Sequence, residues 1–406
     1  MGQRIYFGWF VVAAAFVILL LGFGIAYSFA SFFDGLETDF QASRGDISLV
    51  FSIAGFLYFS LGAVSGPLSD RLGSRPIVAF GILLIAGGLL ASSFAQSLWQ
   101  VYLSYGVAVG VGVGFAYVPS VGVLQRWFVR RRGLASGLAV AGIGVGTLVA
   151  PPFSRFLVEA LGWRETFQVL AGMVLVVGLA AAWMLYPSPA ARGLYPDGDK
   201  TLAGEGASLS GLSVREAMAT RPFWLLFIAS AITSLGMFVP FVHLVKFSVD
   251  QGHDESWSIL LISLIGFGSM SGRLILGGLA DRFGRHRAVI TMFLGLALVQ
   301  GWWYVSTSFW ALAVYAVFFG LFYGGYVALA PALVADYFGA RNVGGILGVQ
   351  YSGTAVGNLV GPVAAGFAFD LTGSYDLPIA ASAAASFLAV ALILLLRSPA
   401  QWRTLV

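Results

Sequence analysis

Apolar residues run along this chain in long stretches, separated by short segments that hold Gly, Pro and most of the charged residues. Twelve stretches reach about 20 residues, the length that an α-helix needs to cross a membrane. They lie at 6–33, 46–69, 76–95, 98–125, 133–158, 164–186, 222–249, 257–280, 287–307, 309–335, 342–369 and 377–397. The pattern therefore predicts an all-α integral membrane protein with 12 transmembrane helices.

The composition agrees with a membrane protein. Of the 406 residues, 59% are hydrophobic and 10% are charged, and the mean hydropathy is +0.88. Soluble domains carry roughly 25% charged residues. Cysteine is absent, and the chain has no nucleotide-binding loop, no histidine cluster with metal spacing and no Gly-x-Ser-x-Gly motif. These features predict neither an enzyme nor a protein with a metal or cofactor.

The basic residues predict the orientation. With a cytoplasmic N-terminus, nearly all Lys and Arg residues fall in cytoplasmic segments. The exceptions are Arg44, Arg155, Arg164, Lys246 and Arg273. The positive-inside rule then places both termini in the cytoplasm.

The two halves of the chain repeat each other. Residues 66–73 match residues 277–284, and residues 146–151 match residues 357–362, both at an offset of 211. The polar segment between the halves is rich in Pro, Gly and Ser and is typical of a linker, with a short helix expected near Ser213. The sequence thus predicts an N-terminal six-helix bundle at 1–187, a linker at 188–220 and a C-terminal six-helix bundle at 221–406. Two pseudo-symmetric bundles with a binding site between them are the plan of an alternating-access carrier.

Arg273 is the charged residue placed most unexpectedly. It lies eight residues before Asp281, or ~12 Å along a helix. A guanidinium at that depth is costly, so it normally faces a watery cavity and has a partner. Its fork of donors matches a carboxylate. We therefore predict a central site for a small organic anion; the alternative is an internal ion pair with a neighbouring helix.

Several other polar side chains are expected near the same depth. The tyrosines are Tyr117, Tyr323, Tyr326 and Tyr351, with Tyr58 deeper. Their hydroxyls can donate to a carboxylate while their rings line an apolar pocket, or they can serve helix packing alone. Asn358 stands where the other half has Thr147. Its amide is a candidate either for binding a substrate hydroxyl or for tying two helices together.

His243 is the one histidine inside a predicted span, and it follows Pro240. An imidazole that titrates near neutrality can relay a proton, so His243 is the proton-coupling candidate; the alternative is a hydrogen bond at the outer mouth. Lys246 and Asp250 are expected to form a solvated pair one helical turn apart.

The doubled loop Gly-x-x-x-Asp-Arg-x-Gly resembles the signature of the major facilitator superfamily. The resemblance implies that Asp70, Arg71, Asp281 and Arg282 form a gate that clamps the halves on the cytoplasmic side, with Asp336 expected to join it.

The stretch from Trp127 to Gly142, Trp-Phe-Val-Arg-Arg-Arg-Gly-Leu-Ala-Ser-Gly-Leu-Ala-Val-Ala-Gly, resembles the fourth-to-fifth-helix signature of monocarboxylate transporters. Gly8-Trp9 matches part of the first-span signature of that family. Short loops, and arginine far in excess of lysine, favour a bacterial homologue in the inner membrane.

The resemblance also places Arg273 where the family has its substrate-binding arginine. Vertebrate members carry an aspartate where this chain has Ser269, and a lysine where it has Tyr27 or Ser28. Both residues are implicated in proton coupling in those relatives, so the proton route and the coupling ion stay open here.

The preferred prediction is a monomeric carrier that moves a small monocarboxylate, such as L-lactate or pyruvate, together with a proton. The partners are the substrate, the proton and the lipid bilayer, without nucleic acid. One alternative is an oxalate/formate-type anion exchanger, which would favour a second buried cation near Arg273. Another is a solute receptor of the same fold that does not transport. Drug export is disfavoured, because a cationic drug would call for a buried acid.

Overall fold

The computed structural model describes residues 6–198, 211–339 and 342–399, and these residues fold almost entirely into helices. The long helices are α1 (Gly8–Tyr27), α3 (Arg44–Ser60), α4 (Gly62–Leu72), α5 (Ser74–Ser93), α7 (Gly110–Trp127), α8 (Arg132–Leu161), α9 (Trp163–Met184), α11 (Arg221–Met237), α12 (Val239–Asp250), α14 (Leu260–Phe283), α15 (Arg285–Val305), α16 (Phe309–Phe338), α17 (Val343–Thr372) and α18 (Asp376–Leu394). The short ones are α2 (Phe33–Phe40), α6 (Leu98–Val101), α10 (Val214–Met218) and α13 (Glu255–Ser258). A π-helical stretch at Tyr102–Val109 joins α6 to α7.

The described residues contain 11 helical segments long and apolar enough to span a membrane, and 12 when the bent pair α3 and α4 is counted as one span. The bend of this pair is 42°. The prediction of an all-α membrane protein with about twelve spans is therefore confirmed.

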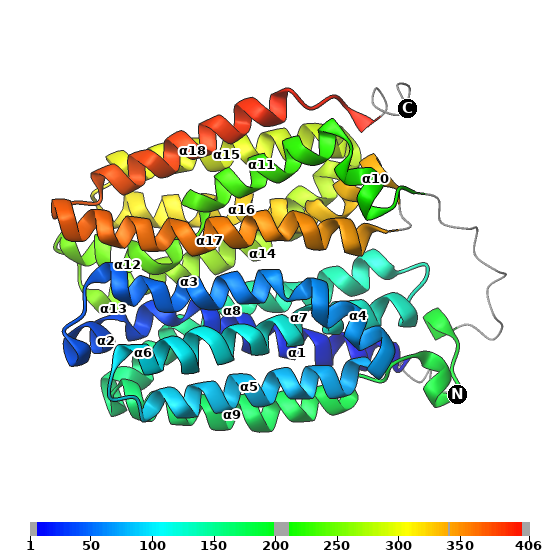
Figure 1. Ribbon diagram of the computed structural model, residues 1–406, viewed down its shortest axis with the longest axis horizontal. Coiled ribbons are helices and arrows are strands. Elements are labelled where there is room, and N and C mark those ends of the chain that lie inside the picture. The colour runs from blue at the N-terminus through cyan, green and yellow to red at the C-terminus, as the bar shows by residue number, and fades with distance from the viewer. Residues whose placement is uncertain (1–5, 199–210, 340–341, 400–406) are drawn as a thin grey trace.

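The helices lie in two groups, α1–α9 and α11–α18, which are stacked one above the other in Figure 1. The main contacts between the groups are α3 with α17 and α8 with α14. In each pair a second span of one half packs against a fifth span of the other, as a twofold repeat requires. Residues 199–210 of the linker lie outside the described residues, so the domain boundaries at 187/188 and 220/221 stay a prediction.

The turn between the second and third spans is the same in both halves. Gly73 ends α4 with φ = 89° and Gly284 ends α14 with φ = 91°. A side chain is strained at such positive φ, which explains glycine at both positions. These glycines are related by the offset of 211, so the sequence repeat is also a repeat of backbone conformation.

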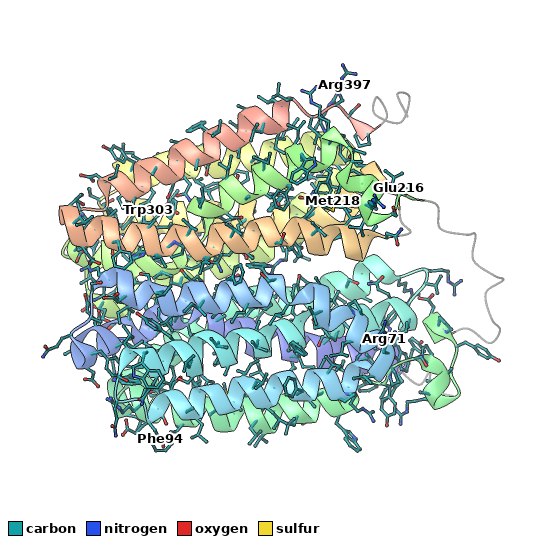
Figure 2. The ribbon with its side chains drawn as sticks, in the orientation of Figure 1. Arg71, Phe94, Glu216, Met218, Trp303 and Arg397 are labelled. Atoms are coloured by element: carbon teal, nitrogen blue, oxygen red, sulfur yellow. The ribbon has the colours of Figure 1, made fainter. Side chains whose placement is uncertain are left out.

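The two ends of the molecule differ in charge. Arg71, Glu216 and Arg397 lie at one end, which also carries α10 (Figure 2). We call it the basic end, because it holds the arginine-rich turns after α4, α7 and α14. The opposite end, formed by α2, α13 and the turn between α17 and α18, carries Asp34, Glu37, Glu255 and Asp370. We call it the acidic end.

Helices α14 and α16 touch backbone to backbone. Gly268 and Gly272 of α14 face the main chain of α16 at Val317 and Leu321. Gly320 and Gly324 of α16 face the main chain of α14 at Ile265 and Ser269. The spacing is that of small-xxx-small motifs, which allow close approach of membrane helices. The contact fixes α16 against the helix that carries Arg273.

This contact predicts a selective loss of stability. A Cβ at Gly272 would collide with the backbone of α16, so we expect Gly272→Ala to lower the free energy of unfolding by about 1–3 kcal/mol. Thermal unfolding of the purified protein in detergent measures the effect. Gly301→Ala in α15 is the matched control, because its added Cβ meets nothing within 4 Å. Equal melting temperatures for the two variants would contradict the prediction.

Candidate functional site

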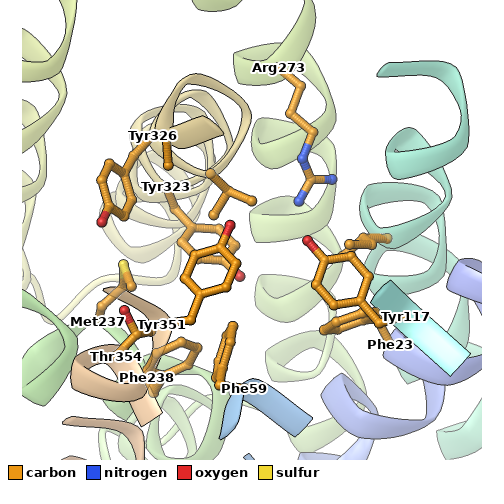
Figure 3. Close-up of a pocket in the computed structure, with 13 residues that line it drawn as sticks. Phe23, Phe59, Tyr117, Met237, Phe238, Arg273, Tyr323, Tyr326, Tyr351 and Thr354 are labelled. Carbon is orange, nitrogen blue, oxygen red and sulfur yellow. The ribbon is translucent and has the colours of Figure 1, made fainter. Parts of the chain in front are cut away.

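A cavity lies between the two helix groups at the middle of the molecule (Figure 3). It is lined by Phe23, Phe59, Tyr117, Ile143, Met237, Phe238, Arg273, Tyr323, Tyr326, Val327, Ala330, Tyr351 and Thr354. Its volume of about 20 Å³ is room for roughly one or two water molecules. A three-carbon acid therefore requires the lining side chains to move apart.

Arg273 is the one charged residue in this lining, and it is 8% exposed. Its Nη1 donates to the carbonyl of Val140 in α8 at 3.3 Å. Its Nε and Nη2 have no hydrogen-bond partner among the described residues. No carboxylate in the described part of the chain pairs with it. Two donors of a buried guanidinium thus remain for a ligand.

Two tyrosines of different helix groups face this guanidinium. The hydroxyls of Tyr117 in α7 and Tyr351 in α17 point toward it (Figure 3). The other two tyrosines present mainly their rings, because their hydroxyls are engaged elsewhere. Tyr323 is bonded to the Tyr27 hydroxyl at 2.9 Å, and Tyr326 to the Ser230 hydroxyl at 2.7 Å.

The arrangement is chemically one-sided. One cation and two hydroxyls lie at one side of the cavity, while Phe59, Met237 and Phe238 form an apolar wall. A carboxylate can accept from the guanidinium fork and a phenol at once, and a small apolar body can pack on aromatic rings. The site thus suits one carboxylate on a small organic body.

Asn358 and His243 do not line the cavity. Asn358 is fully buried against Gly55 of α3, and neither its amide oxygen nor its amide nitrogen has a partner among the described residues. His243 in α12 is also fully buried. Its Nε2 lies 2.8 Å from the Pro362 carbonyl and its Nδ1 3.0 Å from the Tyr375 hydroxyl. A carbonyl only accepts, so Nε2 carries the hydrogen and Nδ1 accepts from Tyr375.

Ion pairs join the two helix groups at the acidic end. Arg44 binds Asp250 with both Nη atoms, at 2.5 and 2.9 Å. The Asp370 carboxylate accepts from the backbone N–H groups of Arg44 and Gly45, at 3.1 and 2.9 Å, and so caps α3 from the opposite group.

Three further ion pairs join the two helix groups at this end. Lys246 binds Asp34 and Glu37, and Arg155 binds Glu255. Burial raises the pKa of Glu37, an effect that Arg44 opposes and that Asp250 and Asp370 reinforce. We call Asp34, Glu37, Arg44, Lys246, Asp250 and Asp370 the acidic-end latch. It ties the two helix groups together at this end.

The latch corrects one prediction. Lys246 and Asp250 were expected to pair with each other in solvent, one turn apart on α12. Instead each binds a residue of the other helix group, and the Lys246 side chain is only 12% exposed. The cause is tertiary: α2 and α3 bring carboxylates and a guanidinium against α12 in geometries that an i,i+4 pair does not offer.

The predicted gate at the basic end is described only in part. Arg71 and Arg282 are exposed near the ends of α4 and α14. The side chains of Asp70 and Asp281 lie outside the described residues, so the clamp role of these four residues stays a prediction. Asp336 accepts from Arg285 at 3.0 Å, and both belong to the second helix group.

Sequence reasoning missed the aromatic neighbours of the site. Tyr27 was considered only as the position of a missing lysine, yet its hydroxyl reaches Tyr323 and its ring stacks on Phe241 at 4.4 Å. The sequence alone did not single out Phe59, Met237 and Phe238, because an apolar residue in a membrane span can face lipid, another helix or a cavity.

Comparisons with known proteins match most of the chain. The sequence model of the Major Facilitator Superfamily matches residues 12–301 and 259–405. Monocarboxylate transporter 3 of Rattus norvegicus is 32% identical over 375 residues, covering 91% of this chain and 76% of the relative. Monocarboxylate transporter 11 of Homo sapiens is 31% identical over 385 residues, covering 91% and 78%. Monocarboxylate transporter 2 of Rattus norvegicus is 29% identical over 385 residues, covering 91% and 78%.

The repeated helix groups and the cavity between them, together with these matches, define a secondary transporter of the Major Facilitator Superfamily rather than an enzyme. Within that superfamily the chain belongs to the monocarboxylate transporter family. The predicted family is thereby confirmed.

Proposed function

We propose that this protein moves a small monocarboxylate, such as L-lactate or pyruvate, together with a proton by alternating access. The observation that carries the proposal is Arg273, a buried guanidinium with two unpartnered donors in a cavity between the bundles. The names of the relatives supply the class of substrate. We further propose that it works as a monomer in a bacterial inner membrane, with the basic end and both termini in the cytoplasm.

The proposed cycle follows from charge. With the cavity empty, the Arg273 cation repels a second positive charge and resists removal from water. A bound carboxylate neutralises it and lowers the cost of closing the site. The latch ties the bundles together at the acidic end, so in the proposed cycle the substrate exchanges with the cytoplasm when the basic end opens while the latch holds. Opening the latch and closing the basic end would expose the same site to the outside.

The test is uptake of labelled L-lactate into proteoliposomes. For one-to-one coupling, an inward gradient of one pH unit should drive about tenfold accumulation, because each pH unit is worth about 1.4 kcal/mol. A protonophore should abolish the accumulation. Uptake that ignores the gradient but depends on internal anion would identify an exchanger instead. Saturable binding without uptake would identify a receptor.

A further inference from the structure

A row of buried polar groups runs from the central cavity toward the acidic end, along the packed faces of α3 and α17. On α3 the row contains Ser48, Ser52 and Tyr58, and on α17 it contains Thr354 and Asn358. The spacing of four residues places Ser48 and Ser52 on one side of α3 and Thr354 and Asn358 on one side of α17, and Tyr58 lies further along α3 toward the cavity. Ser48, Ser52 and Asn358 are 0% exposed and Tyr58 is 1% exposed. We call these residues the α3/α17 polar row.

The middle of the row is unsatisfied. The Ser52 hydroxyl, the Tyr58 hydroxyl and both polar atoms of the Asn358 amide have no hydrogen-bond partner within 3.5 Å among the described residues, although Tyr27 and Asn358 are near the Tyr58 hydroxyl. Pro362 has no N–H, so the main-chain carbonyl of Asn358 also loses its i+4 donor. Leaving such groups unpaired costs about 1–3 kcal/mol each. Ordered water is the usual partner of buried polar groups that lack one in the protein.

Both ends of the row connect to groups already described. At the cavity end, Thr354 lines the site, and the Tyr58 side chain lies beside Tyr27 and Asn358. Tyr27 in turn is bonded to Tyr323, which lines the cavity with Arg273.

At the other end, the Ser48 hydroxyl lies 3.1 Å from His243 Nε2, and His243 reaches Tyr375. The Tyr375 hydroxyl accepts from Arg44, the latch residue that binds Asp250 and lies beside Asp370. Hydroxyls, an imidazole and water can each accept and donate a proton in turn. Apart from the Asn358 amide, which can only hold a water molecule, the row consists of such groups.

We propose that the α3/α17 polar row holds ordered water and carries the coupled proton between the central cavity and His243. The inference rests on the proposed proton-coupled transport. The proton moves as hydronium or by exchange along hydrogen bonds, so no other reactant is needed. Asn358 and Tyr58 act as positioning residues, because they hold the water rather than the substrate.

The first test examines the water itself and does not depend on transport. Hydroxyl-radical footprinting modifies side chains that contact ordered water. We expect Tyr58 to be modified although it is buried, and the modification to fall in Asn358→Val. Tyr105 is the matched control, because it is also 1% exposed but its hydroxyl is bonded to the Ile25 carbonyl at 2.9 Å. Equal, low modification of Tyr58 and Tyr105 would overturn the proposal, whatever the protein transports.

The second test separates proton transfer from substrate handling. Asn358→Val removes the polar group. Asn358→Thr has nearly the same shape as the valine variant but keeps a hydroxyl, like Thr147 at the matching position of the other half. For the valine variant we expect gradient-driven L-lactate uptake to fall about tenfold or more. Lactate exchange across the membrane should stay near the wild-type rate, because exchange returns the loaded carrier without releasing its proton. The threonine variant should keep most of the driven uptake.

Further substitutions keep this test decisive if Asn358→Val does not fold. Tyr58→Phe and Ser52→Ala should show the same split between driven uptake and exchange. Ser120→Ala in α7 should not, although the Ser120 hydroxyl is equally buried and unpartnered among the described residues. Driven uptake that survives in all row variants would refute the proton route. Wild-type protein that fails to couple lactate to a proton would refute the proposed function, while footprinting still decides whether the row holds water.

Discussion

Replacing Arg273 by glutamine should reduce L-lactate uptake by about a hundredfold or more, because truncating one partner of a buried charge pair costs roughly 2–5 kcal/mol. The lysine variant should retain part of the activity, since it keeps the charge but loses the fork that binds a carboxylate with two donors. Initial rates in proteoliposomes measure both effects. Arg287→Gln, which removes an exposed arginine at the basic end, is the control and should leave uptake unchanged.

The stability of Arg273→Gln distinguishes a substrate-binding arginine from one half of a structural ion pair. If the arginine were half of a structural ion pair, its loss would leave a buried carboxylate unpaired and cost about 3–5 kcal/mol. The described residues offer it no carboxylate, and two of its donors are unpartnered. We therefore expect Arg273→Gln to melt at the wild-type temperature or above it. Uptake that survives the substitution, or a large drop in melting temperature, would show that Arg273 serves the fold.

Removing Arg44 should open the acidic end. Arg44 binds Asp250 across the two bundles, and losing it leaves carboxylates of the latch without their cation. At roughly 2–5 kcal/mol for a partly desolvated pair, Arg44→Ala should shift the balance of open and closed states by more than tenfold. Spin labels on cysteines introduced at the exposed positions Thr38 and Gln251 report the separation of the bundles. The chain has no cysteine of its own, so only these two sites are labelled.

We expect a single short distance between these labels in the parent protein and a second, longer one in Arg44→Ala. Arg164→Ala is the matched control, because Arg164 pairs with Asp39 inside one bundle. It breaks an ion pair at the same end without touching the interface. Identical distance distributions for the two variants would mean that apolar packing of α3 on α17 holds the end closed without the latch.

The sequence predicted the features that repeat or that conflict with their surroundings. The spans were visible because a membrane helix must be apolar along its length. Gly73 and Gly284 revealed the sequence repeat, because the same backbone turn with positive φ requires glycine at both positions. Arg273 was conspicuous because a charge at that depth is costly, and its depth alone matched it with Tyr117 and Tyr351.

What the sequence did not predict depends on contacts between distant segments. The partners of Lys246 were missed, because local spacing favours Asp250 whereas the fold brings α2 against α12. The unsatisfied amide of Asn358 was not foreseeable either, since burial and hydrogen bonding are properties of the packed α3/α17 face. His243 was singled out as the one histidine inside a predicted span, but its hydrogen bonds to Pro362 and Tyr375 depend on contacts between distant segments. Its role in proton transfer stays a prediction.

The glycine contact between α14 and α16 determines which residues of the site move together during transport. Because these helices touch main chain to main chain, Arg273 and Tyr323 must move as one rigid body when the bundles rock. Tyr117 and the Val140 carbonyl belong to the other bundle, so their distances to the arginine change when the bundles rock. In the proposed transport cycle, the C-terminal bundle would hold the carboxylate and the N-terminal bundle would move over it. The two halves, although similar in fold, would thus have different roles in transport.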